Sequence, residues 1–252
     1  MLTTLVGVIH LRGRGADVLI DESCGAPVIA YWGAPIGEID GDSVATALKR
    51  ATVPGGLDVI APISVVPEHG SGFVGRPGLQ GHRPGGSAWA PRFRPAGVDQ
   101  VPEGVVVHAV DEVAELRLAI TITLGAVLCI DCAITNEGDT RYLLAGLYGT
   151  LPLPIHASEL LTFYGRWSRE LHPVRHPWRG GAWSAENRSG RTSHEHSPLL
   201  FAGEVGFGEW HGEVWGVHVA WSGNHTMYAE CLPDGRRYVQ GGELLHPGEC
   251  CV

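Results

Sequence analysis

The sequence predicts an all-β protein made of stacked antiparallel sheets. Short apolar runs recur about every 8 to 12 residues, with turn-forming residues between them. The 36 glycines and 17 prolines are spread along the chain and not gathered in one linker. Hydrophobic residues make up 44% and charged residues 18%, as in ordinary globular proteins. The 252 residues suffice for one large β domain or two smaller ones.

The first third of the chain contains strand signals and one helix signal. Three apolar runs within residues 2–33 predict successive strands, and we expect residues 17–21, with a Val-Leu-Ile centre, to be buried on both faces. Residues 43–51 have helical spacing, because Asp42 or Ser43 can cap the segment and Pro54 follows it. We therefore expect one short helix in a β protein.

A glycine-rich segment follows a further strand signal. Residues 57–67 have strand character, and Pro62 indicates an edge or a bulge. Residues 68–86 predict a long loop without secondary structure, which in a compact domain is typically functional or mobile. Its glycines do not follow a strand and open a helix, so they predict no nucleotide site.

The middle and end of the chain return to strands. The predicted strands cover residues 105–110, 115–135 with a break near Gly125, 142–154, 226–231, 237–240 and 243–245. Strict alternation after Glu115 predicts one buried row of side chains. This row comprises Leu116, Leu118, Ile120 and Ile122. Pro233-Asp234-Gly235 predicts a tight turn.

Charge and cysteine usage exclude several classes of function. A net charge of −9 and a single lysine argue against a nucleic-acid partner. The first ten residues are too short and uncharged for a signal peptide, and no apolar run has the length of a membrane span, so we expect a cytoplasmic protein without a membrane partner. Cys129 and Cys132 lie three apart in a strand-like run and should face opposite sides, which disfavours a redox or zinc site. We expect free, buried thiols.

Residues 178–224 form the most distinctive stretch. Two extended segments frame a loop crowded with hydrogen-bonding side chains. Such a loop is either a binding face or a polar network that holds two strands together, and we favour the network.

The sequence offers only weak evidence for catalytic or metal-binding side chains. His194 and His196 share a face of an extended segment, but a metal site needs a third ligand such as His211, His218 or Glu213, and 13 histidines make such pairs common. Ser193 and His194 are adjacent and point to opposite faces, so they cannot act as nucleophile and base. Nothing distinguishes two possible carboxylate pairs from solvated residues. These pairs are Asp131 with Glu137 and Glu186 with Glu195. We expect neither a metal nor a catalytic residue.

The eight tryptophans have two possible roles, as platforms for sugar rings or as packing in the core and at domain interfaces. Packing is favoured for any single one. They are Trp32, Trp89, Trp167, Trp178, Trp183, Trp210, Trp215 and Trp221.

Four motifs in this order resemble glycoside hydrolase family 36, the α-galactosidases and their relatives. They are Tyr31-Trp32-Gly33, residues 164–170 (YGRWSRE), residues 189–198 (SGRTSHEHSP), and residues 212–216 (GEVWG) followed by Ser222-Gly223-Asn224. The resemblance covers nearly the whole chain but only the first domain of the family. It implies that residues 1–252 form an amino-terminal β-supersandwich and that the catalytic (β/α)8 barrel lies outside this chain.

The resemblance also implies an activity for the full-length enzyme. Family members are retaining glycosidases that hydrolyse terminal α-D-galactosides with two barrel aspartates, one of them in a K-x-D segment. The lysine of this chain is Lys49, and Ala51 stands where the aspartate is needed. We therefore expect no catalytic residue here, no activity of the chain alone and no cofactor. The implied partners are the barrel, a galactoside and further copies in a homo-oligomer.

Within the glycine-rich segment the family carries a D-y/f-R-x-P motif that reaches the mouth of the barrel. Arg76-Pro77 fits this motif, although no acidic residue lies within three positions before Arg76. The resemblance implies substrate contacts by Phe73 and Arg76. Two alternatives stay open: a free-standing carbohydrate-binding module with exposed tryptophans, and an oligomerisation domain without a ligand.

Overall fold

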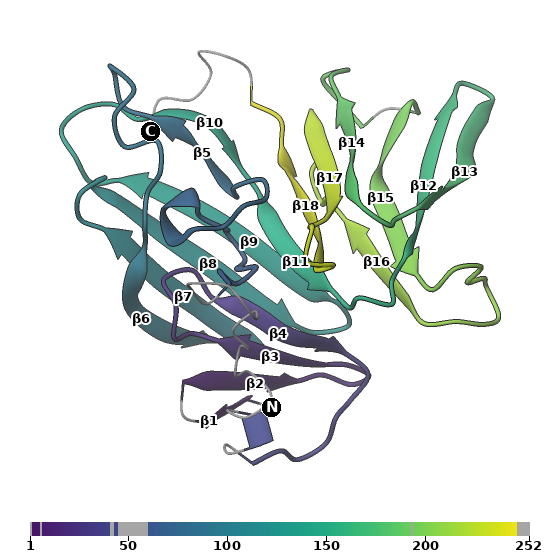
Figure 1. Ribbon diagram of the computed structural model, residues 1–252, viewed down its shortest axis with the longest axis horizontal. Coiled ribbons are helices and arrows are strands. Elements are labelled where there is room, and N and C mark those ends of the chain that lie inside the picture. The colour runs from purple at the N-terminus through teal and green to yellow at the C-terminus, as the bar shows by residue number, and fades with distance from the viewer. Residues whose placement is uncertain (1, 6, 41–42, 45–59, 193, 246–252) are drawn as a thin grey trace. The chain divides into compact units, whose positions relative to one another are not determined.

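The computed structural model describes residues 2–5, 7–40, 43–44, 60–192 and 194–245, and this part of the chain is almost entirely β (Figure 1). Its strands form antiparallel sheets, so the predicted all-β class is confirmed. The described residues divide into two compact units, one within residues 1–149 (unit 1) and one within residues 150–249 (unit 2). No helix of the described part is long and apolar enough to cross a membrane.

Unit 1 begins with a four-stranded sheet in the order β1 (Leu2–Leu5), β2 (Val8–Arg12), β3 (Asp17–Asp21) and β4 (Val28–Gly33). Every residue of β3 is buried, as predicted. The buried carboxylate of Asp17 is compensated, since it lies 3.1 Å from Nε2 of His10 and accepts the N–H of Ile36.

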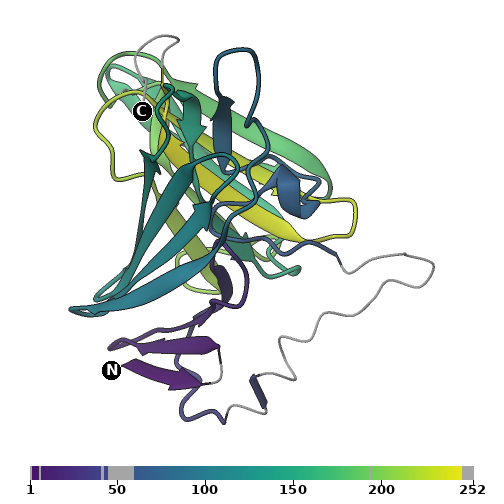
Figure 2. The same ribbon diagram turned by 90° about the vertical axis from the view of Figure 1, so that its left-hand side faces the viewer.

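A second sheet of unit 1 has the order β6 (Arg94–Val101), β7 (Gly104–Asp111), β8 (Leu116–Leu124) and β9 (Leu128–Asn136). Buried and partly buried side chains alternate strictly along strand β8. Its four predicted core residues have no exposed surface, which confirms the predicted buried row. Strand β2 contacts β8, and the two sheets are drawn in purple and teal in Figure 2. Strand β6 was not predicted, because its side chains are nearly all exposed and show no alternation.

Two sequence-based predictions in unit 1 are wrong. The described part of the predicted strand at residues 57–67 pairs in no sheet, since Pro62 and Pro67 lack a ladder N–H, although Val65 and Val66 are fully buried. The glycine-rich segment is not without structure, because it holds the 3-10 helix η1 (His69–Ser71) and β5 (Leu79–His82). Strand β5 pairs with β10 (Leu143–Leu147). The predicted helix at 43–51 lies outside the described residues except at 43–44.

Unit 2 contains two four-stranded sheets. The first has the order β11 (Gly149–Leu153), β18 (Arg237–Glu243), β17 (His225–Cys231) and β14 (Gly181–Asn187). The second has the order β13 (Arg169–Pro177), β12 (Glu159–Arg166), β15 (His196–Gly203) and β16 (Val214–His218). Strand β15 contacts β14 and β17 of the other sheet, and buried residues such as Leu200 and Met227 lie on these strands.

The end of unit 2 follows the sequence closely. The predicted strand at 226–231 is β17, and the predicted strand at 237–240 lies in β18, which continues to Glu243. The separate strand predicted at 243–245 is wrong, because residues 244–245 lie in no strand. The turn between β17 and β18 is confirmed, since the N–H of Gly235 donates to the carbonyl of Leu232 at 2.9 Å and Gly235 has a φ of 87°.

Candidate functional site

The polar loop after β14 is tied to the segment before β17 by buried hydrogen bonds. Asn187, 1% exposed, donates through Nδ2 to the carbonyls of Arg191 (2.6 Å) and Gly223 (3.3 Å). Its Oδ1 accepts the N–H of Ser189. A fully engaged buried amide of this kind fixes a loop conformation.

A second set of bonds joins the same two segments. The side chain of Asn224 accepts the N–H of Gly190 at 2.8 Å, and the N–H of Thr192 donates to the carbonyl of Ser222 at 2.7 Å. The carbonyl of Asn224 also accepts the N–H of Leu244, next to β18. At these residues the distinctive motifs therefore form a structural network, as favoured from the sequence.

The histidines near this network do not form a metal centre. Within the described ranges, no group of three or more His, Cys, Asp or Glu side chains could hold a metal ion. Burial lowers the pKa of His225, and the nearby charges of His196 and His218 lower it further, against a raising effect of the Gly223 carbonyl. Burial thus disfavours the protonated form of His225.

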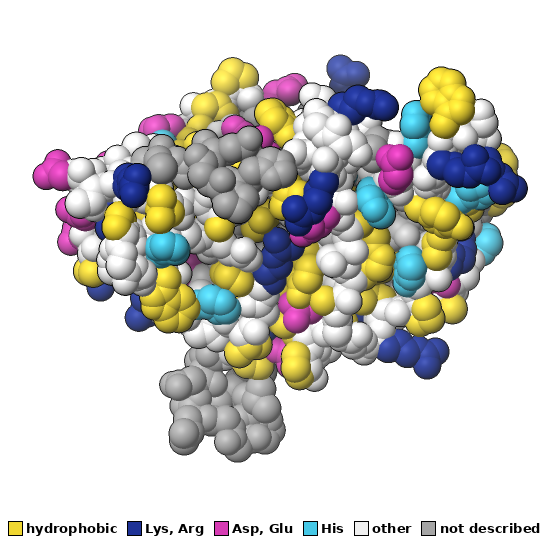
Figure 3. All heavy atoms as spheres, turned by 90° about the horizontal axis from the view of Figure 1, so that it is seen from above, with side chains coloured by type: hydrophobic (Ala, Val, Ile, Leu, Met, Phe, Trp, Pro, Cys, Tyr) yellow, Lys and Arg dark blue, Asp and Glu magenta, His cyan; other side chains and the backbone are white. Residues whose placement is uncertain are grey.

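The hairpin between β12 and β13 carries an exposed patch, which we call the hairpin patch. Its members come from the hairpin and from the loop before β15, and they are Tyr164, Trp167, Glu170, Leu171, His172 and His194. Trp167 is 77%, Leu171 62% and Tyr164 54% exposed. Figure 3 shows, on one face, histidines and arginines beside exposed hydrophobic side chains.

Ring contacts and one weak ion pair organise the hairpin patch. The Trp167 and His194 rings meet edge to face at 5.8 Å, and the Tyr164 and His172 rings are also 5.8 Å apart. Nδ1 of His194 lies 4.0 Å from the Glu170 carboxylate. The backbone N–H of Glu170 itself, then that of Ser168, donates to this carboxylate and lowers its pKa. The exposed hydrophobic residues of the hairpin patch therefore lie close to ionisable side chains.

The two predicted substrate-binding residues lie in different surroundings. Phe73 is only 3% exposed, whereas the neighbouring Val74 is 74% exposed. Arg76 is half-buried and its guanidinium lies 4.3 Å above the ring of Tyr148. The ring of Phe73 therefore packs in the interior of unit 1, and Arg76 stacks on the ring of Tyr148. Contact of either residue with a sugar stays a prediction.

The glycine-rich segment is held at both ends by buried charged residues that the sequence did not single out. Arg83, 7% exposed, donates to the carbonyls of Ala114 and Thr140 and to Oδ1 of Asn136. Glu68, 8% exposed, begins η1, and its backbone carbonyl accepts the hydroxyl of Ser71. Burial raises the pKa of Glu68 to about 7 against the opposing N–H of Phe93. No sequence pattern marks either residue, because their partners lie far away in the chain.

The carboxylates considered from the sequence are bound in ordinary ion pairs or exposed. Glu137 pairs with Arg117 and Glu186 with Arg188. Asp131 is exposed on β9. These exposed or arginine-paired carboxylates lack the buried, apolar surroundings in which a general acid of a retaining glycosidase is held.

The tryptophans divide into two groups. Trp178 and Trp215 are buried, as favoured from the sequence, and Trp32 and Trp183 are partly exposed. The other four are more than a third exposed and lie at turns and loops, so they do not pack in the core, whereas packing at a domain interface stays a prediction for them. These four are Trp89 (63%), Trp167 (77%), Trp210 (92%) and Trp221 (45%).

Cys129, Cys132 and Cys231 are free cysteines, and Cys24 is partly buried. Cys231 is buried, while Cys129 is exposed on β9, so burial was predicted wrongly there. Cys132 is partly buried, and burial raises the pKa of its thiol to about 12. The different exposure of Cys129 and Cys132 agrees with their predicted opposite faces.

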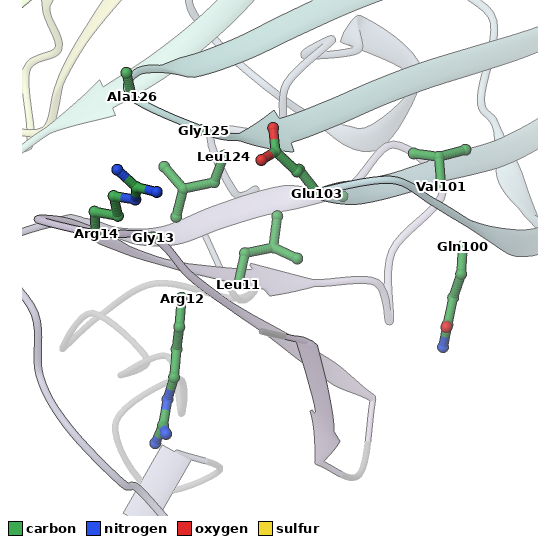
Figure 4. A pocket seen from close by; sticks show the side chains of 11 residues that line it. Leu11, Arg12, Gly13, Arg14, Gln100, Val101, Glu103, Leu124, Gly125 and Ala126 are labelled. Atoms are coloured by element: carbon green, nitrogen blue, oxygen red, sulfur yellow. The ribbon is translucent and has the colours of Figure 1, made fainter.

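Unit 1 contains a cavity of about 630 Å³ where three turns meet (Figure 4). Leu11, Leu124 and Glu103 lie around its centre, whereas Arg12 points away from them. Arg14 and Glu103 are exposed. This open, mixed cavity contains no aromatic side chain in its lining and offers no catalytic arrangement.

The family model and the relatives that match this chain all point to one family. The family model described as "Glycosyl hydrolase family 36 N-terminal domain" matches residues 25–250. An α-galactosidase of Escherichia coli is 39% identical over 242 residues, which are 95% of this chain and 34% of the relative. The α-galactosidase AgaA of Geobacillus stearothermophilus is 26% identical over 95% of this chain and 38% of its own length.

Solved structures have the same fold. The α-galactosidase of Lactobacillus brevis superposes with a TM-score of 0.83 at 18% identity, over 97% of this chain and 37% of that protein. A variant of AgaA from Geobacillus stearothermophilus in complex with stachyose gives 0.81 at 21% identity, over 94% and 37%. The chain thus spans about a third of the length of the relatives it matches.

Proposed function

This chain belongs to glycoside hydrolase family 36 as its N-terminal domain, and from that membership we propose that it is the non-catalytic part of an α-galactosidase-like retaining enzyme. The complete enzyme hydrolyses terminal α-D-galactosides in galacto-oligosaccharides. In this proposal residues 1–252 form one family domain made of the two compact units, and the catalytic barrel is supplied by further polypeptide.

One observation carries the proposal: 95% of this chain matches only 34% of the E. coli α-galactosidase. Two thirds of such a protein have no counterpart here. The described carboxylates that the sequence brought forward are exposed or paired with arginine, which suits a supporting role and not acid catalysis.

The hairpin patch supports a large protein partner. Contiguous exposed apolar surface on an otherwise charged protein is typical of an interaction site. Trp167, Tyr164 and Leu171 are three exposed large apolar side chains on one hairpin, which also carries Glu170 near His194. We assign this patch to contact with the catalytic domain.

The other parts of the proposal concern substrate, assembly and location. The segment with Phe73 and Arg76 shapes the mouth of the active site, and the domain assists homo-oligomer formation. The location is cytoplasmic, which the free thiols of Cys129, Cys132 and Cys231 support, since a reducing compartment keeps thiols free.

The test joins this chain to the two thirds of the E. coli relative that it does not match, and measures hydrolysis of p-nitrophenyl α-galactoside. We expect activity of the joined protein, none of this chain alone and little of the remainder alone. Hydrolysis by this chain alone would refute a non-catalytic role. Equal activity of the remainder with and without the chain would refute a supporting role.

A second candidate function is a carbohydrate-binding module, favoured by the four exposed tryptophans. It requires binding of galactosides by this chain alone.

A further inference from the structure

The loop between β15 and β16 presents a tryptophan at the tip of a tight turn. The N–H of Gly208 donates to the carbonyl of His211 at 3.0 Å, and these two residues form an isolated β-bridge. Glu209 and Trp210 occupy the two positions between them, and both are exposed. Trp210 is 92% exposed, the largest value among the tryptophans of the described chain.

The loop that carries this turn is braced from the neighbouring strands. Arg175 donates through Nη2 to the carbonyl of Phe207 at 2.6 Å, and its guanidinium lies 4.7 Å from the centre of the Phe207 ring. Glu159 accepts both Arg175 and the N–H of Gly206. The ring of Phe207 is buried, so it anchors the loop in unit 2.

Neither turn formation nor burial explains why a tryptophan occupies position 210. Turn positions favour glycine, asparagine, aspartate or proline, and an indole with 92% exposure adds almost nothing to burial. The contrast is with Trp215, a few residues later, which is 7% exposed and packs edge to face on His156 at 5.4 Å. A rigid loop that holds an aromatic ring out to solvent is pre-organised for a ligand.

We propose that Trp210 and Glu209 form a binding platform for galactosides. The indole presents an electron-rich face. A galactopyranose ring has its axial 4-hydroxyl on one side, so the C–H groups at carbons 3, 4 and 5 form an apolar patch on the other side that stacks on such a face. Glu209 precedes Trp210 in the turn and is also exposed, so its carboxylate supplies an acceptor for sugar hydroxyl groups in charge-assisted hydrogen bonds.

A sugar fits this site better than a protein does. The neighbours of Trp210 in the chain are Glu209, His211 and two glycines, and the other exposed hydrophobic residues in or next to this loop, Val205 and Val214, carry small side chains, whereas protein partners bury several large apolar side chains together. The hairpin patch has several large apolar side chains together and differs in this respect. The platform goes beyond the supporting role proposed above, because it places a ligand on this chain itself.

The experiment uses the chain alone, labelled with 5-fluorotryptophan, and melibiose as the probe. The ¹⁹F resonances are assigned by single Trp→Phe substitutions, and the sugar is added to about 100 mM, enough to occupy most of a site with a Kd of ~10 mM. We expect a saturable shift of the Trp210 resonance. The resonance of Trp167, which is also highly exposed, should not shift and serves as the matched control.

A native gel containing galactomannan tests the same site with variants. Retardation of the parent chain should be lost in Trp210→Ala and kept in Trp89→Ala, and Glu209→Gln should weaken melibiose binding about 3- to 10-fold. The proposal is overturned if the Trp210 resonance does not move, or moves no more than that of Trp167. It is equally overturned if Trp210→Ala abolishes self-association while leaving retardation unchanged. Neither readout needs hydrolysis, so failure here is separate from failure of the enzymatic proposal.

Discussion

At the scale of single residues, Glu68 and Arg83 are two ionisable side chains buried in unit 1, and they differ in how well their polar atoms are hydrogen-bonded. Arg83 directs its nitrogens at several backbone and side-chain oxygens, so its burial is compensated. Glu68 receives the N–H of Phe93, but its Oε1 is buried without a hydrogen-bond partner among the described residues. The carboxyl group is therefore better tolerated when it is protonated.

We predict a pH-dependent stability caused by Glu68. Its pKa is 4.5 in a free chain and about 7 in the fold, so the folded state holds the proton more tightly. The contribution is most favourable below pH 4.5, falls as pH rises towards 7 and then stays low, a change of about 3 kcal/mol. Glu68→Gln should unfold at higher urea concentration than the parent at pH 8 and differ less at pH 5. Parallel pH profiles of the two proteins would contradict this.

Arg83 should be intolerant even of lysine. An ammonium group cannot reach Ala114, Thr140 and Asn136 at once, so buried oxygens lose their donors. We expect Arg83→Lys to lower the free energy of unfolding by about 2–4 kcal/mol, measured by urea denaturation. Arg94→Lys, at an exposed position, is the matched control and should change it by less than about 0.5 kcal/mol. A small effect at both positions would show that the Arg83 contacts contribute little.

At the scale of elements, strands are positioned by close backbone approaches as well as by their apolar rows. A Cβ added at Gly104, at the start of β7, would lie 2.0 Å from the carbonyl oxygen of Ile122 in β8. Strand β13 is an edge whose side chains are largely exposed, and Pro173 and Pro177 limit further pairing there. Glycine and proline therefore decide where these sheets begin and stop.

Gly104→Ala should destabilise unit 1 by about 2–3 kcal/mol, because the neighbour that must move is backbone. Gly15→Ala is the control, since no atom lies within 4 Å of the added Cβ, and it should be neutral or stabilising by about 0.5 kcal/mol. Thermal unfolding followed by circular dichroism measures both. Equal melting temperatures of the two variants would rule out the close approach as the cause.

At the scale of the whole molecule, the chain consists of two compact units, and unit 2 exposes the apolar hairpin patch. We predict that the isolated chain self-associates as its concentration rises, because this patch has no catalytic domain to cover it. The double substitution Trp167→Ser with Leu171→Ser should shift the sedimentation profile towards monomer. Val113→Ser removes a 94% exposed side chain from unit 1 and should leave association unchanged. A parent chain that stays monomeric at all concentrations would contradict the prediction.

The sequence by itself determined the β class, the buried row of β8, the full burial of β3, the turn at Gly235 and the family. These features depend on local periodicity, on turn chemistry or on motifs that are contiguous in the chain.

Only the tertiary structure decided the rest. It showed which tryptophans are exposed, that residues 60–67 form no strand, and that Arg83 anchors a loop through residues 31 and 57 positions away. It also showed the braced turn that presents Trp210. Such features arise from contacts between segments distant in sequence, and neither periodicity nor composition encodes which segments meet.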